Sequence, residues 1–127
     1  MDLNKDSGDG YLAHLDAIGA EDAAGLKKAQ ESYGDSWKRR GGVGAFFVAW
    51  RKADRLENQV AKCIVIDGLA ENEKEVVATP YDIFAHVAHD PRAEGILDDI
   101  RDLRRYLMLI EAEMRARGLQ ACHRDNK

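Results

Sequence analysis

The chain has 127 residues, of which 45% are apolar and 33% charged, and it contains only two prolines. This length and composition indicate one compact helical domain and exclude both a two-domain protein and a disordered chain. The formal net charge of −4 disfavours stable binding to nucleic acid, because no general basic field is available to hold phosphates.

No apolar run approaches the roughly 18 residues of a membrane span, and the first residues lack the apolar core of a signal peptide. We therefore expect a soluble, cytoplasmic protein without a membrane partner, located in the host cytoplasm if it is phage-encoded. Residues 1–10 are polar and glycine-containing, and residues 119–127 follow the last periodic segment, so both ends are expected to be flexible.

A first helix is predicted from near Tyr11 toward Ser32, where a weak apolar face has helical spacing. Gly34 is placed to end this helix, because glycine readily takes the left-handed conformation that follows a helix C-terminus. The basic, glycine-rich residues 38–42 are then expected to form a connector.

A second helix is predicted from about Val43 to Val65, where apolar residues recur every three or four positions. The recurring residues are Phe46, Phe47, Trp50, Ala53, Leu56, Val60, Ala61 and Ile64. Asp54 and Glu57 follow Trp50 by about one and two turns, so we expect them on the flank of a buried stripe.

Residues 66–92 have the weakest pattern in the chain. Thr79 and Pro80 are suited to the N-cap and first position of a short helix that continues through His89, and no alternating pattern predicts a strand. The H-x-x-H spacing of His86 and His89 is compatible with a second metal site, but this spacing occurs readily by chance.

The last helix is predicted from Arg92 to about Arg117, with Gly118 as its stop. Its apolar stripe comprises Ile96, Ile100, Leu103, Leu107, Ile110 and Met114. Asp99 and Asp102 border this stripe. The predicted fold is therefore all-α, a single domain over residues 1–127 that forms an antiparallel bundle of three to four helices.

Four carboxylates thus border the two clearest apolar stripes, in two pairs at i,i+3 spacing. Charged groups near a core are costly unless they are paired or hold a cation, and clustered carboxylate oxygens are typical ligands of Mg²⁺ or Mn²⁺. Lys52 and Arg55 lie one turn apart beside the first pair and are suited to neutralising phosphate. The alternative interpretation is an ordinary solvated helix face.

Three segments together resemble the all-α nucleoside triphosphate pyrophosphatases, the MazG-like proteins. They are Tyr33-Gly34-Asp35-Ser36-Trp37, the run WRKADRLE at 50–57 and the run DIRDLRRY at 99–106. The resemblance covers about residues 26–115, with 66–92 as a poorly matched insert. Within the family, the chain is most similar to the MazZ-type proteins and the phage nucleotide-modification-associated branch.

In that family, E-x-x-E and E-x-x-D pairs on two helices bind Mg²⁺ or Mn²⁺, and an activated water attacks the α-phosphorus to release pyrophosphate. The resemblance places these pairs on Asp54 and Glu57 and on Asp99 and Asp102, where two aspartates shorten the reach by one methylene each. It implies hydrolysis of a purine (deoxy)nucleoside triphosphate, dGTP or GTP, to its monophosphate, in a phage pathway toward a modified purine.

Substrate contacts are assigned to six residues near the expected pocket. They are Gln30, Trp37, Lys38, Lys52, Arg55 and Tyr106. An aromatic ring can stack on a purine while an amide side chain forms a hydrogen bond with it. Tyr33 and Trp50 are also aromatic, but helix packing explains them at least as well, whereas Trp37 lies in a polar loop.

Three helices and a short one cannot cover the broad apolar surface of the two long helices. We therefore expect a closed homo-oligomer, a homodimer or a homotetramer, as the resemblance also implies.

Two other functions stay open. One is a non-catalytic helical phage protein that binds nucleotides or a partner helix, and the other is a dimeric nucleic-acid accessory protein that uses the basic patch at 38–40.

Overall fold

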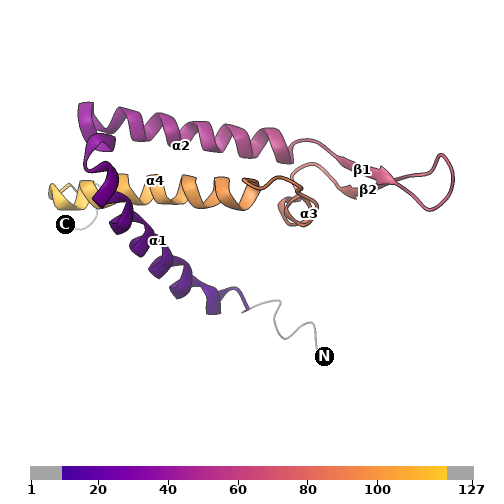
Figure 1. The fold of residues 1–127 in the computed structure, drawn as a ribbon, viewed down its shortest axis with the longest axis horizontal. Coiled ribbons are helices and arrows are strands. Elements are labelled where there is room, and N and C mark those ends of the chain that lie inside the picture. The colour runs from indigo at the N-terminus through magenta and orange to yellow at the C-terminus, as the bar shows by residue number, and fades with distance from the viewer. Residues whose placement is uncertain (1–9, 120–127) are drawn as a thin grey trace, which may run out of the picture.

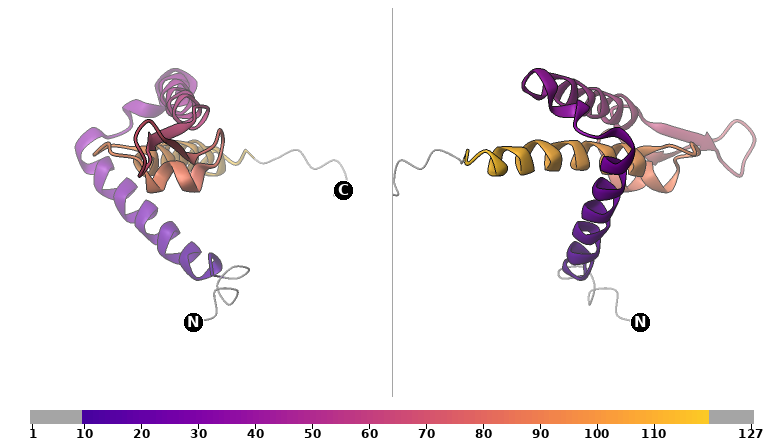
Figure 2. Two further views of the ribbon diagram at one scale, coloured as in Figure 1. Left: turned by 90° about the vertical axis from the view of Figure 1, so that its right-hand side faces the viewer. Right: turned by 60° about the vertical axis from the view of Figure 1, so that its left-hand side comes forward.

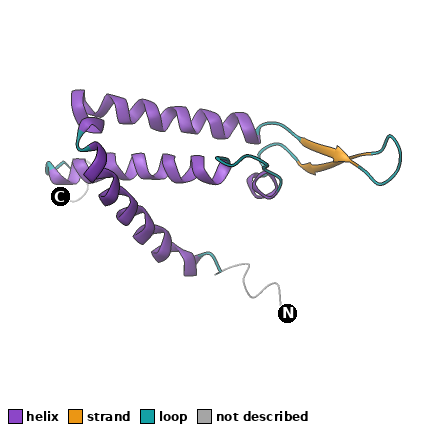
Figure 3. Ribbon diagram, in the orientation of Figure 1, coloured by secondary structure: helices purple, strands orange, loops and turns teal. Residues whose placement is uncertain are grey.

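A computed structural model describes residues 10–119, so the flexibility predicted for the two ends falls almost entirely outside the described residues. This part of the chain is mostly helical, with one small two-stranded sheet (Figures 1 and 3). Its elements are α1 Leu12–Tyr33, the 3-10 helix η2 Ser36–Lys38, α2 Arg39–Val60, β1 Ile64–Asp67, β2 Lys74–Ala78, α3 Ile83–Ala88 and α4 Ile96–Ala116. None of its helices is long and apolar enough to cross a membrane.

The centre of the structure is the pair α2 and α4, which run antiparallel beside each other (Figure 1). The part of α2 that is buried here consists of small side chains, because Ala45 and Ala49 are only 1% and 3% exposed. Short side chains let two helix axes approach closely. The core continues through Val60 and Ile96 to Ala78 at the base of the hairpin.

The helix α1 diverges from this pair, as the two turned views make clear (Figure 2). It ends as predicted at Gly34, which has a φ of +62° and whose N–H donates to the carbonyl of Gln30. The only buried residue of α1 is the charged Asp22. The attachment of α1 to the rest of the chain is therefore polar where a helix of a bundle would normally be apolar.

The start of α2 contains three consecutive residues with left-handed backbone conformations, Arg40, Gly41 and Gly42. The regular right-handed part therefore begins at about Val43, where the sequence predicts a helix start. Glycine adopts positive φ at little cost, but Arg40 carries a Cβ that clashes in this conformation.

The prediction of a continuous helix to Val65 is wrong, because α2 ends at Val60 and a β-hairpin follows. Strands β1 and β2 pair antiparallel, with Ile64 opposite Ala78 and an irregularity before Val65. The hairpin projects from the end of the helical pair (Figure 3). Most of its side chains are exposed, so the sequence lacks the alternation of a half-buried strand.

The two remaining helices are shorter than predicted because side-chain caps fix where they begin. α3 starts at Ile83. The residue before it, Asp82, accepts a hydrogen bond from the N–H of Ala85 at 3.1 Å. α4 starts at Ile96 rather than Arg92, and the Asp90 carboxylate accepts the N–H of Ile96 at 2.7 Å. The first contact is an ordinary aspartate N-cap, whereas Asp90 lies six residues before Ile96 and accepts the first free N–H of α4 from outside its N-cap position, Gly95.

Candidate functional site

The predicted carboxylates of α2 lie on the side of that helix that faces away from α4. Asp54 and Glu57 are exposed, and at 3.6 residues per turn they share a face with Phe46 and Trp50. Trp50 is 59% exposed. The expectation that the aromatic residues form a buried stripe is therefore wrong within one chain, because alanines occupy the contact with α4.

Besides the alanines, two cations of α2 also lie toward α4. Lys52 Nζ lies 3.1 Å from Asp102 Oδ2 and 3.8 Å from Asp99 Oδ1. Arg55 Nε lies 3.4 Å from Asp99 Oδ2. The structure thus brings together Lys52, Arg55, Asp99 and Asp102, four of the predicted site residues, as a polar cluster between the helices.

Asp99 is the most unusual member of this cluster. Its side chain is 1% exposed, and within residues 10–119 its Oδ2 atom has no hydrogen-bond partner. A buried carboxylate oxygen without a donor carries a large desolvation cost. Arg55 is close enough to attract it but does not form a hydrogen bond to it, so the oxygen is available to a further cationic ligand.

The donor set fits a magnesium ion only in part. In the described residues, no group of three or more His, Cys, Asp or Glu side chains converges as a metal cage, so Asp54 and Glu57 do not join Asp99 and Asp102 within one chain. Magnesium, however, is commonly bound by one or two carboxylates together with substrate phosphates and water. Asp99, whose Oδ2 atom accepts no hydrogen bond, and the neighbouring Asp102 fit that arrangement.

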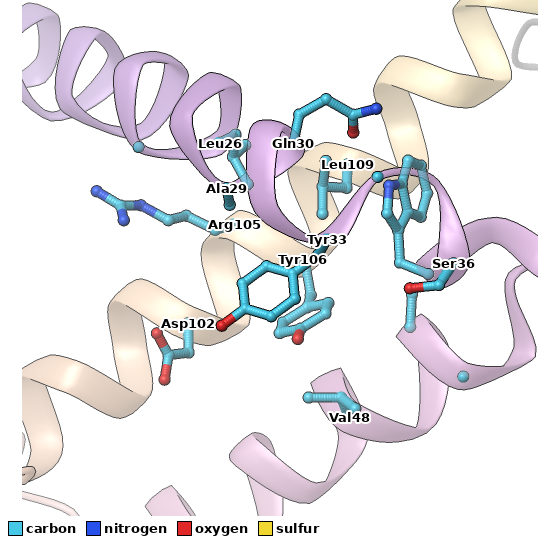
Figure 4. A pocket seen from close by; sticks show the side chains of 15 residues that line it. Leu26, Ala29, Gln30, Tyr33, Ser36, Val48, Asp102, Arg105, Tyr106 and Leu109 are labelled. Carbon is cyan, nitrogen blue, oxygen red and sulfur yellow. The ribbon is translucent and has the colours of Figure 1, made fainter.

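A cavity of about 500 Å³ adjoins Asp102, between the end of α1, η2, the start of α2 and the middle of α4. Its lining includes the predicted substrate residues Gln30, Trp37 and Tyr106. Figure 4 shows the rings of Tyr33 and Tyr106 in the middle of the cavity, with Asp102 and Arg105 on one side and Ser36 on the other. Asp102 therefore belongs both to this cavity and to the ion-pair cluster.

Lys38, also predicted to contact substrate, does not line this cavity. It pairs with Glu113 at 3.2 Å and with Asp35 at 3.6 Å, and it borders a separate cavity of about 440 Å³. Hydrogen bonds from Arg117 and Lys38 lower the pKa of Glu113. The structure thus gives Lys38 a stabilising partner at the outer end of α4 and separates it from the carboxylate pair.

Sequence reasoning missed a second charged cluster beside the cavity, formed by Asp22, Arg104 and Arg105. The carboxylate of Asp22 is 2% exposed and accepts hydrogen bonds from both arginines. These bonds, led by that of Arg104, lower the pKa of Asp22 to about 2. The adjacent arginines were visible in the sequence, but nothing local linked them to an aspartate 82 residues earlier.

The H-x-x-H segment does not form a metal site in this structure. His86 is 1% exposed, and its Nδ1 and Nε2 atoms lie 2.8 and 2.6 Å from the carbonyl oxygens of Asp82 and Lys62. With both ring nitrogens facing carbonyls, neither is free for a metal. His89 is exposed at the end of α3.

Comparison of the chain with protein-family models, curated proteins and solved structures finds no match. The family resemblance therefore stays a prediction that rests on the three segments of the sequence. In the structure, residues 33–37 and 99–106 both contribute to the lining of the 500 Å³ cavity. The third segment, 50–57, contributes Lys52 and Arg55 to the adjoining ion pairs.

Proposed function

We propose that this protein is a metal-dependent pyrophosphohydrolase that converts a purine (deoxy)nucleoside triphosphate and water into the monophosphate and pyrophosphate. The observation that carries the proposal is the dual position of Asp102. Its side chain lines an aromatic cavity and also pairs with Lys52, beside the orphaned carboxylate oxygen of Asp99. A nucleotide in the cavity would have its phosphates next to this cluster.

The cluster contains the groups that phosphoanhydride hydrolysis requires. Such a reaction needs little covalent participation by the protein and depends on charge neutralisation and an aligned water. Asp99 and Asp102 would hold a magnesium or manganese ion, which neutralises phosphate charge and activates water when bound. Lys52 and Arg55, which now pair with these carboxylates, would then be released to bind phosphate oxygens.

The cavity has the size and lining of a small-molecule site. Its volume of about 500 Å³ lies within the roughly 300–1,000 Å³ typical of such sites. Tyr33, Trp37 and Tyr106 offer aromatic faces for a base, and Gln30 offers an amide. The side chain of Gln30 donates to Asp35 at 2.9 Å, so base recognition would exchange this bond for one to the purine. The preference for dGTP or GTP rests on the resemblance alone.

We further propose that a second copy of the chain covers the outer face of α2, which completes the predicted bundle between chains. Phe46 and Trp50 stack there with ring centroids 6.0 Å apart, although both are more than half exposed. Contiguous exposed apolar surface is typical of protein interfaces. Asp54 and Glu57 lie on this face, so a homodimer or homotetramer would bring them to the interface near the active sites.

The test of the reaction is product analysis. The purified protein is incubated with each of the eight common nucleoside triphosphates and Mg²⁺, and the products are separated by ion-exchange chromatography. We expect monophosphate and pyrophosphate from a purine nucleotide, with no turnover in EDTA. Diphosphate and orthophosphate as first products would contradict the proposal. Nucleotide binding without turnover would favour the non-catalytic alternative.

A further inference from the structure

Two neighbouring arginines of α4 bind the same buried aspartate, but only one of them lines the cavity. Arg104 binds Asp22 through Nε and Nη2, the latter at 2.8 Å from Oδ1. Arg105 donates from Nε to the same Oδ1 at 2.7 Å. Arg105 is a lining residue of the 500 Å³ cavity, whereas Arg104 is not. The two arginines thus share a structural partner and differ in access to a ligand.

The guanidinium group of Arg105 is fixed by α1 at three points. Besides the bond to Asp22, its Nη2 donates to the carbonyl oxygen of Glu21 at 3.2 Å. It also lies directly against Gly25, where a Cβ atom would come within 2.6 Å of Nη1. A larger residue at position 25 would therefore displace the guanidinium. In the part of the chain that the structure describes, Nη1 has no hydrogen-bond acceptor.

The two guanidinium groups of this cluster have different surroundings. Both donate to Asp22, whose pKa they lower to about 2, but the pKa of Arg104 is raised by Asp22 and also by the nearby carboxylate of Glu21. Arg105 is therefore the cation of the cluster that is placed at the cavity wall, on the same side as Asp102 (Figure 4). A preorganised guanidinium recognises phosphate oxygens with planar, paired N–H donors.

We propose that Arg105 binds the terminal phosphates of the nucleoside triphosphate and that Asp22 is its positioning residue, so that α1 must dock on α4 before the phosphate site is complete. The inference rests on the proposed function, since it assumes a triphosphate in the cavity. It also couples ligand binding to the position of α1, because a ligand that binds only when α1 is docked on α4 stabilises that docking. Asp22 acts through Arg105 and does not contact the substrate.

The test compares the full-length Arg105→Gln and Arg104→Gln variants, which lose the same charge and the same partner. Binding of inorganic tripolyphosphate is measured by calorimetry, KM and kcat by pyrophosphate release, and folding by thermal unfolding. Loss of one charged hydrogen-bond donor to phosphate is expected to weaken tripolyphosphate binding about 10-fold or more in Arg105→Gln. Arg104→Gln should lower the melting temperature similarly but change binding less than about 3-fold.

Three further variants keep the test decisive if Arg105→Gln fails to fold. Gly25→Ala removes no charge but displaces the guanidinium, so it should raise KM with little change in kcat. Asp22→Asn should also raise KM, because Arg105 loses its positioning partner. Arg105→Lys restores the charge without the planar donors and should recover part of the tripolyphosphate affinity.

The outcomes separate this inference from the proposed reaction. Equal weakening of tripolyphosphate binding in the Arg104 and Arg105 variants would show a purely structural cluster and overturn the inference. Normal tripolyphosphate binding by Arg105→Gln would overturn it while leaving the proposed reaction intact. Conversely, Arg105-dependent binding in a protein that hydrolyses no nucleotide would support the phosphate site and reject the reaction.

Discussion

Lys52 on α2 pairs with Asp102 on α4, with 3.1 Å between Nζ and Oδ2, directly beside the buried Asp99. A cation therefore occupies the position opposite Asp99 and Asp102 where the sequence resemblance leads us to expect the acidic pair Asp54 and Glu57. Lys52 is part-buried, so its pairing with Asp102 is less screened than a surface ion pair. Binding of a metal and a triphosphate would exchange this pair for carboxylate–metal and lysine–phosphate contacts.

The first prediction follows from that exchange. Asp102→Asn should lower metal-dependent turnover by about 100-fold or more, since a lost metal ligand costs several kcal/mol of transition-state stabilisation. Its helical content, measured by circular dichroism, should be unchanged. Glu111→Gln is the matched control, because Glu111 lies on the same helix and, among residues 10–119, pairs only with Arg115 at the surface. Wild-type turnover in Asp102→Asn would show that Asp102 is not a ligand.

The helices of this protein could largely be predicted from the sequence because their signals are local. Gly34 and Gly118, expected as helix stops, have φ values of +62° and +76°. The apolar period of the last helix corresponds to α4, which packs along α2. Helix starts were placed less well, because the caps Asp82 and Asp90 act over three to six residues in a weakly patterned segment.

The buried face of α2 could not be predicted from periodicity. Ala45 and Ala49 are buried, while the larger Phe47 is 62% exposed. A helical period of apolar residues predicts that this face of the helix is buried, but it does not predict whether the same chain or another chain buries it. The positions of Asp54 and Glu57 were predicted relative to Trp50. Because Trp50 lies on the exposed face of α2, the two carboxylates lie there as well.

The charged clusters of the site were equally inaccessible to local reasoning. Asp22 and Arg105 are 83 residues apart, and nothing in the weak pattern of α1 predicts that its one buried side chain is charged. The hairpin was missed because a local signal was misleading. Ile64 follows Val60 at helical spacing, but Ile64 is already the first residue of β1.

His86 provides a prediction about pH. A neutral imidazole has one N–H, yet both ring nitrogens of His86 face carbonyl oxygens, so the imidazolium form is favoured. The bond to Asp82 and then that to Lys62 raise the pKa of His86 above its ordinary value of 6.5. The raised folded-state pKa means that its stabilising contribution is full below about pH 6.5 and is lost as pH rises through the folded-state pKa.

Thermal unfolding measured from pH 5.5 to 9 checks this expectation. The His86→Gln variant should lose the part of the pH dependence that lies above 6.5, because glutamine carries no titrating proton. The control is His89→Gln, since His89 is an exposed histidine at the end of the same helix. An identical pH dependence in wild type and His86→Gln would contradict the assignment of a buried imidazolium.

The left-handed turn before α2 predicts a stabilising substitution. Arg40 has a φ of +54°, a conformation that costs a residue with a Cβ roughly 1–2 kcal/mol. Arg40→Gly removes that cost but gains freedom in the unfolded chain, so the net increase in unfolding free energy should be about 0.5–1 kcal/mol. Urea unfolding measures it. The same change at Arg39, which has a φ of −64°, should instead destabilise the protein.

The last prediction concerns assembly. The ring of Phe46 lies against those of Phe47 and Trp50, with centroids 5.7 and 6.0 Å apart, yet all three residues are at least half exposed. We expect light scattering at micromolar concentration to show a dimer or tetramer of the 14.2 kDa chain. Trp50→Lys should dissociate it, because the change removes the largest apolar side chain of the outer face of α2.

The control for assembly is Leu69→Lys, the same kind of change at a fully exposed apolar residue in the turn between β1 and β2. This variant should remain oligomeric. If dissociation of Trp50→Lys also removes activity, the active site needs a group from the second copy, and Asp54 and Glu57 on the same face are the candidates. A monomeric wild-type protein that still turns over substrate would mean that the site is complete within one chain and that Asp99 and Asp102 suffice.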